Sequence, residues 1–225
     1  MNNINNFQIF GLRHSILAMK NSYKLGTNPN DYNKLEDKDF NLALKLGSVS
    51  VGAGHDSYLK GIRVLFDFRT TQYLDHQMQR YRFFDIVSSQ SIMHKIKGIC
   101  EDSVKLDFNI FKKNYFNEEL QMDDIIIKNL INELQRAQRE NKSIDYIRSI
   151  IPEGTMLWKT ISTNYLQLKT IYYQRRYHKL NEWQEFCKYL EKLPLLKNIL
   201  LNINLTEDDL EILRNINDYL EFNIC

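Results

Sequence analysis

Two segments of this 225-residue chain carry side chains suited to binding a polar ligand. The first spans residues 71–84, where five side chains recur at three- and four-residue steps and so share one face of a helix: Tyr73, Gln77, Arg80, Tyr81 and Phe84. An amide, a guanidinium and aromatic rings together are unusual on a helix that only packs into a core. The spacing also fits an amphipathic helix with a solvated polar edge, so both interpretations stay open.

The second segment runs from Arg148, just before Pro152, to the basic and aromatic run Tyr172–His178. Arginine suits a phosphate or a pyrimidine edge because its planar fork donates two parallel hydrogen bonds and stays charged. Aromatic residues alternating with arginine could instead stack on single-stranded bases. A third interpretation is a basic helix end that complements the helix dipole.

Local patterns predict the elements that position the first segment. Val64–Phe68 reads as a short buried strand, and Thr70 and Thr71 offer a helix N-cap. We expect a helix from Thr71 to Phe84, because this stretch lacks Gly and Pro. The small polar residues of Val87–Ser91 predict a loop.

The other elements are predicted with the same rules. We expect a strand-to-helix or helical opening, three further helical stretches, the first of them ending at Gly47, and a capped helix in the tail. The helical stretch that starts at Thr155 should bend near 177–181 and end at Pro194. The turns and loops fall between these elements. The ranges, in chain order, are Phe7–Asn21, loop Lys24–Asn33, helix Asp37–Gly47, turn Gly52–Asp56, irregular Ile99–Phe116, helix Asp123–Asn141, helices Thr155–Leu193 and tail helix Thr206–Leu220.

Length and composition indicate an ordinary globular protein of one domain, or of one domain with a small appendage. We place the domain at 1–194 and a helical extension, packed on it, at 195–225. The net charge is +2, so no strong field recruits nucleic acid or a membrane surface. No apolar run is long enough to span a bilayer, and the N-terminus is not a signal peptide. Three dispersed cysteines form no metal or disulfide pattern and fit a reducing cytoplasm.

Several motifs resemble those of the flavin-dependent thymidylate synthases. Gln77-Met-Gln-Arg80-Tyr81-Arg82, followed by a serine-containing loop, is similar to the family pattern Q-x-x-R-H-R with x-x-S-x-N-E-x-S-x-R-Y. Gly54-His55-Asp56-Ser57 resembles its G-H-x-S/T, and Ala18–Tyr23 resembles its A-A-R-x-S-Y. In the second half, Arg176 stands seven residues before Trp183, as in the family's L-R-x-x-x-x-A-Q-W-E. The resemblance spans about Ala18 to Leu193 in the correct order.

The resemblance implies an α+β fold with long helices on a small antiparallel or mixed sheet. It also implies a methyltransferase that converts dUMP to dTMP, with methylenetetrahydrofolate as carbon donor, NADPH as reductant and FAD as cofactor. It implies a homotetramer with shared active sites. Carried over by position, the implied catalytic residues are Arg176 and Ser91. The implied nucleotide-binding residues are Gln77, Ser89, Gln90, Ser91, Arg148 and Arg176, and the implied cofactor-binding residues are Arg80, Tyr81, Arg82, Asn164, His55 and Ser57.

The chain also departs from the family pattern. Tyr81 replaces the middle histidine of R-H-R, Val87-Ser88-Ser89 stands where N-E is expected, and Met93 and His94 replace R-Y. Three alternatives therefore stay open. The chain could be a catalytically degenerate homologue that binds a nucleotide or serves in assembly, an enzyme that modifies C5 of UMP or another uracil nucleotide, or an unrelated helical module for single-stranded nucleic acid.

Overall fold

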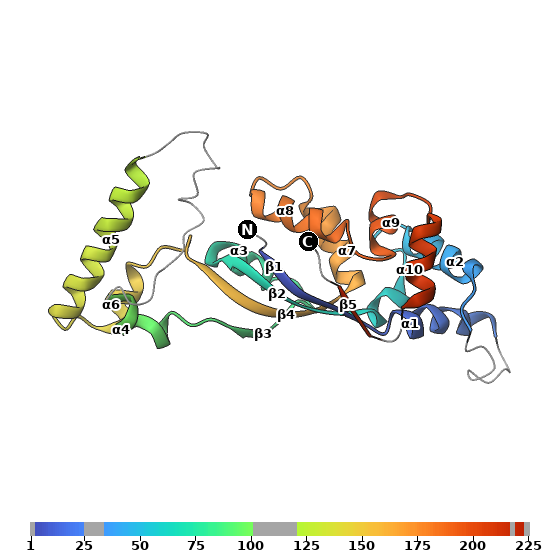
Figure 1. The fold of residues 1–225 in the computed structure, drawn as a ribbon, viewed down its shortest axis with the longest axis horizontal. Coiled ribbons are helices and arrows are strands. Elements are labelled where there is room, and N and C mark those ends of the chain that lie inside the picture. The colour runs from blue at the N-terminus through green and yellow to red at the C-terminus, as the bar shows by residue number, and fades with distance from the viewer. Residues whose placement is uncertain (1–2, 25–33, 101–120, 217–218, 223–225) are drawn as a thin grey trace. The chain divides into compact units, whose positions relative to one another are not determined.

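The computed structural model describes residues 3–24, 34–100, 121–216 and 219–222 (Figure 1). Its strands form a sheet in the order β3-β4-β2-β1-β5, in which β1 pairs antiparallel with both β2 and β5. The architecture is mixed helix and sheet, which confirms the predicted α+β class. The strands are β1 Ile4–Phe10, β2 Arg63–Thr71, β3 Asp85–Ser89, β4 Met156–Asn164 and β5 Tyr219–Phe222.

The α-helices of the described residues lie before, between and after these strands, and none is long and apolar enough to cross a membrane. They are α1 Leu12–Ala18, α2 Asp37–Gly47, α3 Gln72–Met78, α4 Ile96–Cys100, α5 Gln121–Arg139, α6 Ile144–Ser149, α7 Tyr165–Arg175, α8 Asn181–Leu190, α9 Leu196–Leu201 and α10 Glu207–Asn215. Short 3-10 helices cover Met19–Tyr23, Ser57–Gly61 and Met93–Lys95.

The chain divides into two compact units. The first unit comprises Met1–Phe68, Tyr81–Val87 and Thr160–Cys225, and the second comprises Arg69–Arg80 and Ser88–Lys159. Strands β2, β3 and β4 therefore contribute residues to both units. The proposed division into a domain at 1–194 and an extension at 195–225 stays a prediction.

Aromatic side chains from β2 and α8 build the core of the first unit. Phe66 stacks on Phe7 with ring centroids 4.9 Å apart, and Phe68 stacks on Phe186 at 5.1 Å. Alternate residues of β2 are buried, which is the two-residue period of a strand with one covered face. Each fully buried side chain of this size contributes about 1.5–3 kcal/mol to folding.

A buried ion pair joins the turn at 52–56 to α7 in the same unit. Lys169 is fully buried, and its Nζ donates to Asp56 Oδ2 at 2.6 Å and to the backbone oxygen of Val49 at 2.7 Å. Gly52 and Gly54 both have positive φ, as the sequence prediction of a turn requires. The pair fixes the turn against the helix that carries the basic and aromatic run.

The second unit has its own apolar cluster under α5. Leu134 and Ala137 of α5 are fully buried. They belong to one cluster of buried residues with Cys100, Ile147 and Ile151. The predicted helix at 123–141 is confirmed as α5. Its predicted core stripe is wrong at Ile126, which is 44% exposed because the buried face begins further along the helix.

The largest correction concerns residues 156–164, which form strand β4 and not the start of a helix. Thr160, Ile161 and Thr163 are β-branched residues that favour a strand, and the burial of Lys159, Ile161 and Thr163 alternates along it. Because β4 lies between β3 and β2, both of its edges are hydrogen-bonded. The predicted helical segment therefore begins only at Tyr165, while the bend near 177–181 is confirmed by the gap between α7 and α8.

Two further expectations are wrong at their edges. The predicted helix at 71–84 ends at Met78, so Arg80, Tyr81 and Phe84 do not continue the helical face of Gln77. The loop predicted at 87–91 is wrong in its first part, because residues 87–89 belong to strand β3 at one edge of the sheet. An edge strand with an exposed face shows no burial alternation that a sequence could reveal.

Most of the remaining predictions are confirmed. The opening is strand-to-helix, α2 has the predicted bounds, and Thr71 caps α3 by accepting from the backbone N–H of Leu74 at 3.3 Å. The tail contains α9 and α10 as helices, but Leu220 lies in β5, which was not predicted. The predictions for 24–33 and 99–116 lie largely outside the described residues.

Candidate functional site

The corner between β2 and α3 holds Arg148 in the second unit. Arg148 comes from the last turn of α6, and its Nη2 donates to Gln72 Oε1 at 2.6 Å. Gln72 in turn donates from Nε2 to the backbone oxygen of Pro152 at 3.3 Å. Arg148 is half-buried and forms no ion pair with any residue that the structure describes. Arg148 is therefore positioned by Gln72, and its positive charge is not neutralised by any residue of the described chain.

Another cation of the second unit is neutralised internally. Lys159 is 4% exposed, and its Nζ donates to Thr70 Oγ1 at 2.9 Å and lies 3.6 Å from Asp75 Oδ1. This ion pair holds β4, β2 and the first turn of α3 together. Lys159 is thus a structural residue, in contrast to Arg148.

In the first unit, Tyr81 bonds to the C-terminal end of α7. Its hydroxyl accepts from Arg175 Nε at 2.7 Å and donates to Gln174 Oε1 at 3.0 Å. The guanidinium carbon of Arg175 also lies 5.6 Å from the centroid of the Tyr81 ring and 5.1 Å from that of the fully buried Trp183 ring. These cation–π contacts hold the turn after α3 against α7 and α8.

Arg176, the next residue, lies among three tyrosines. Its guanidinium carbon is 5.5, 5.2 and 4.8 Å from the ring centroids of Tyr172, Tyr173 and Tyr177. Its Nε is buried and has no hydrogen-bond partner among the described residues. An unpaired buried donor on a cation is costly unless a ligand satisfies it.

Tyr172 is a structural neighbour of Arg176. Burial, together with the hydrogen bond that Tyr172 donates to Glu191 at 2.6 Å, raises the pKa of the Tyr172 hydroxyl to about 12. Tyr172 is 3% exposed, so it cannot stack on a base. Of the three tyrosines in the alternative single-stranded nucleic-acid module at residues 172–178, Tyr172 is therefore not available, whereas Tyr173 and Tyr177 are exposed.

The serine-rich segment lies along β3 and just after it. Gln90 is bonded to Trp158, because its backbone N–H donates to the Trp158 oxygen at 2.9 Å and its Oε1 accepts from the Trp158 N–H at 3.1 Å. Ser89 is exposed, and Ser91 Oγ accepts from the backbone N–H of His94 at 3.5 Å. Gln90 therefore has a structural role, because it is hydrogen-bonded to the backbone of β4, whereas Ser89 is exposed to solvent.

Solved structures of known proteins share this architecture. Flavin-dependent thymidylate synthase ThyX from Helicobacter pylori, complexed with FAD and dUMP, matches with TM-scores of 0.66 and 0.65 in two structures, at 18% and 16% identity. These matches cover 93% and 88% of this chain and 99% and 97% of the ThyX chains. No protein-family model and no curated protein matches the sequence.

This chain has the fold of the flavin-dependent thymidylate synthases.

A third structure extends the likeness to another member of this fold. The UMP/dUMP methylase PolB from Streptomyces cacaoi, bound with 5-Br dUMP, matches with a TM-score of 0.62 at 11% identity over 89% of this chain and 95% of that chain. The resemblance found in the motifs is thus confirmed at the level of the fold.

The residues expected at the flavin fit the cofactor in part. Arg80, Arg82 and His55 are exposed, and no ion pair within the described chain occupies the two arginines, so they could meet a pyrophosphate. Asn164 is instead buried and caps α7 by accepting from the Gln167 N–H at 2.9 Å. Ser57 donates to the Gly54 oxygen at 2.7 Å within its turn.

The expected site residues are divided between the two units of the ThyX-like fold. The second unit holds Gln77, Arg80, Ser89, Gln90, Ser91 and Arg148, and the first holds Arg176, Tyr81, Arg82, Asn164, His55 and Ser57. Sequence reasoning missed Gln72, and it treated Arg175 only as part of a basic run. No sequence signal distinguishes Gln72, whereas Arg175 stands where the family pattern has leucine.

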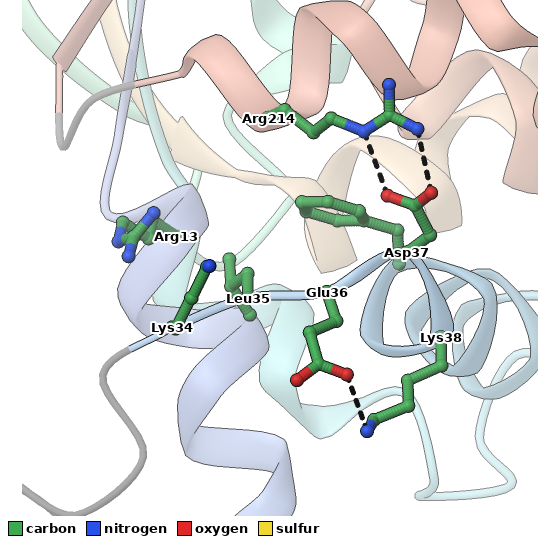
Figure 2. Close-up of a pocket in the computed structure, with 8 residues that line it drawn as sticks. Arg13, Lys34, Leu35, Glu36, Asp37, Lys38 and Arg214 are labelled. Atoms are coloured by element: carbon green, nitrogen blue, oxygen red, sulfur yellow. Dashed lines mark hydrogen bonds and ion pairs between the residues drawn. The ribbon is translucent and has the colours of Figure 1, made fainter.

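A pocket of about 730 Å³ in the first unit contains none of these expected residues. Figure 2 shows Arg214 bonded through two nitrogens to Asp37, and Glu36 paired with Lys38. Because its carboxylates are already paired with cations, this pocket is not a candidate for the chemistry expected at the arginines. Among the described residues, no group of three or more His, Cys, Asp or Glu side chains could hold a metal ion.

Proposed function

We propose that this protein catalyses flavin-dependent reductive methylation at C5 of a uracil nucleotide, dUMP or UMP. With dUMP the product is dTMP, methylenetetrahydrofolate is the carbon donor and NADPH the reductant. One observation carries the proposal: within a ThyX fold, Arg148 and Arg176 are half-buried arginines that no carboxylate of the described chain neutralises. Such arginines suit the phosphate and the uracil edge of a nucleotide.

Arg148 is proposed to bind the nucleotide phosphate. Gln72 takes one of its donors and so holds the guanidinium in place, while its remaining N–H groups stay available for phosphate oxygens. Gln77, which is half-buried on α3, is proposed to contact the nucleotide as well, and Ser89 and Ser91 to reach it from β3 and the residues after it.

Arg176 is proposed to donate to a uracil carbonyl and to stabilise negative charge that develops on the ring. Its unpartnered Nε and its three tyrosine contacts support this role, because they fix a cation that lacks an anion. FAD, when bound, would supply the hydride, and Arg80, Arg82 and His55 would hold it. The protein would then act by binding and orienting its ligands.

The cysteines support a mechanism without a thiol nucleophile. Cys100 and Cys187 are both buried. Burial, with a further contribution from Glu191, raises the pKa of the Cys187 thiol to about 12, so it stays protonated near neutral pH. Cys225 lies outside the described residues.

A second candidate function is nucleotide binding by a homologue that has lost the flavin chemistry. The observation that favours it is the commitment of the Tyr81 hydroxyl to Arg175 and Gln174. The single O–H donor of Tyr81 is thus used within the chain and cannot be donated to a cofactor at the same time. A homotetramer and a cytoplasmic location are proposed with either function.

The deciding experiment is the visible absorbance of the purified protein, with FAD added and dUMP or UMP titrated afterwards. A bound-flavin spectrum that shifts with nucleotide, followed by NADPH-dependent formation of a C5-methylated product, would support the enzyme. We expect Arg176→Ala to abolish turnover with little loss of stability, while Arg139→Ala, an exposed control on α5, leaves turnover unchanged. Nucleotide binding without flavin uptake would support the second candidate, and retained turnover in Arg176→Ala would contradict the assigned role.

A further inference from the structure

Arg175 has a structural setting that the proposed roles do not explain. It is half-buried at the last residue of α7, against the rings of Tyr81 and Trp183. Trp183 itself is fully buried, and its ring meets the Tyr81 ring edge-on with centroids 6.0 Å apart. The two rings and the hydrogen bond from Nε to the Tyr81 hydroxyl fix the guanidinium from several sides.

The terminal nitrogens of Arg175 have no hydrogen bond or ion pair within the described part of the chain. Because Nε is already used, the free edge of the fork consists of Nη1 and Nη2, which carry donors in the geometry of an oxyanion. Arginine that serves only packing is usually paired with a carboxylate when it is removed from water. The guanidinium of Arg175 is fixed in place, but its Nη1 and Nη2 donors are not used within the described part of the chain.

The charges around Arg175 also favour an anion. The pKa of His178 is lowered, first because burial disfavours its charged form and then because of the positive charges of Arg175 and Lys179. Arg176 adds a further cation that no carboxylate of the described residues pairs. A local excess of positive charge raises the affinity for phosphate.

We propose that Arg175 is a second anion-binding residue at this end of α7, which takes a phosphate group of one of the two ligands in the proposed function, the nucleotide or the flavin. This inference rests on the proposed function. The family pattern has a leucine at the position of Arg175 and a histidine at the position of Tyr81. The two residues that differ from the pattern are thus hydrogen-bonded to each other. Tyr81 aligns Arg175, and Arg175 supplies the charge.

The phosphate could belong to the nucleotide or to the flavin, and paired ligands separate these sources. Binding of FAD is compared with that of riboflavin, and binding of dUMP with that of deoxyuridine, by calorimetry on the full chain. We expect Arg175→Leu to weaken one phosphorylated ligand by about tenfold or more and to leave its phosphate-free counterpart unchanged. The affected pair, FAD or dUMP, identifies the source.

Two variants serve as controls. Arg175→Lys keeps the charge but loses the fork, and we expect an intermediate loss of affinity. Lys179→Ala removes an exposed neighbouring cation and should change affinity less than Arg175→Leu does. The thermal midpoint of each variant shows whether a loss of binding comes from loss of folding. If Arg175→Leu does not fold, the same ligand pairs are compared between wild type and Arg175→Lys.

Several results would overturn the inference. One is equal affinity of wild type and Arg175→Leu for both FAD and dUMP. Another is an equal loss for phosphorylated and phosphate-free ligands, which would mean that Arg175 only supports the local structure. If wild type binds neither FAD nor dUMP, the proposed function fails, and inorganic pyrophosphate becomes the probe. Binding of pyrophosphate that Arg175→Leu loses would still support Arg175, and absence of binding to wild type would refute it.

Discussion

The orientation of Gln72 is determined by its two partners. A backbone carbonyl only accepts and a guanidinium only donates, so Nε2 must face Pro152 and Oε1 must face Arg148. Gln72 is largely buried at 9% exposure, which limits exchange of these bonds with water. Gln72 is therefore a positioning residue for Arg148 in the proposed function.

We predict that Gln72→Leu raises the KM for dUMP by about tenfold, because the lost bond to a charged group is worth about 1.5–3 kcal/mol and leaves Arg148 less well placed. The kcat should change little. The measurement is steady-state kinetics, with binding of dUMP and deoxyuridine compared, and Gln135→Leu on α5 is the control. A loss that is the same for both ligands would show that Gln72 does not act through the phosphate.

Lys169 and Asp56 form an ion pair that is buried in the first unit, so each charge is compensated by the other and not by water. We predict that Lys169→Met lowers the free energy of unfolding by about 3–5 kcal/mol, since Asp56 would keep a buried charge without its partner. Urea unfolding measures this change, and Lys188→Met, at an exposed position on α8, should cost less than about 0.5 kcal/mol.

The double variant Lys169→Met with Asp56→Leu tests the reason for that loss. It should be more stable than Lys169→Met alone, because no uncompensated charge remains. A double variant that is less stable than the single one would mean that the bond from Lys169 to the Val49 oxygen, or packing, carries the effect.

At the scale of elements, helix α10 begins with a reciprocal capping box. Thr206 Oγ1 accepts from the Asp209 N–H at 3.2 Å, and Asp209 Oδ2 accepts from the Thr206 N–H at 3.0 Å and from Asn198 Nδ2 at 2.9 Å. Burial acts to raise the pKa of Asp209, but these hydrogen bonds and Lys197 lower it overall. Its ionised form is thus favoured in the folded protein.

The sign of the pH dependence follows from that shift. Because the folded-state pKa lies below the ordinary aspartate value of about 3.9, the stabilisation is complete above that value and is lost as pH falls through the folded pKa. We predict that Asp209→Ala lowers the free energy of unfolding by about 1 kcal/mol at pH 7 and by less below pH 4.

Urea unfolding at pH 7, 5 and 3.5 measures the effect. Asp208→Ala is the matched control, because Asp208 lies in the same helical turn and is exposed. A destabilisation by Asp209→Ala that is equal at all three pH values would contradict the role of its charge.

At the scale of the whole molecule, the tail beyond Pro194 is attached to the first unit both by apolar contacts and by ion pairs. Helices α2, α9 and α10 lie beside one another (Figure 1). Leu213 of α10 is 2% exposed, whereas Arg214 bonds to Asp37 and Glu207 with 40% of its side chain exposed. Exposed ion pairs contribute little because water screens them.

We predict that Leu213→Ala lowers the free energy of unfolding by about 2–5 kcal/mol, because it leaves a cavity. Arg214→Ala, the neighbouring change, should cost less than about 1 kcal/mol and should lose that effect in high salt. Chemical unfolding of both variants at low and high salt checks this. A larger loss for Arg214→Ala would mean that the network in Figure 2 holds the tail.

Elements whose signal is local could be predicted from the sequence alone. Thr71 at the start of α3, helix α2, and the capping box of Thr206 and Asp209 depend on residues a few positions apart, and all were predicted. Motif resemblance also indicated the ThyX fold, which the structural match confirms at 18% identity.

Features that depend on residues far apart in the sequence could not be predicted before the chain was seen folded. Residues 156–164 become a strand because β2 and β3 supply hydrogen bonds along both edges, which no local window reveals. Arg148 meets Gln72, and Arg175 meets Tyr81, across many intervening residues. Such contacts depend on how elements pack, and packing energy is shared among residues that the chain alone does not place together.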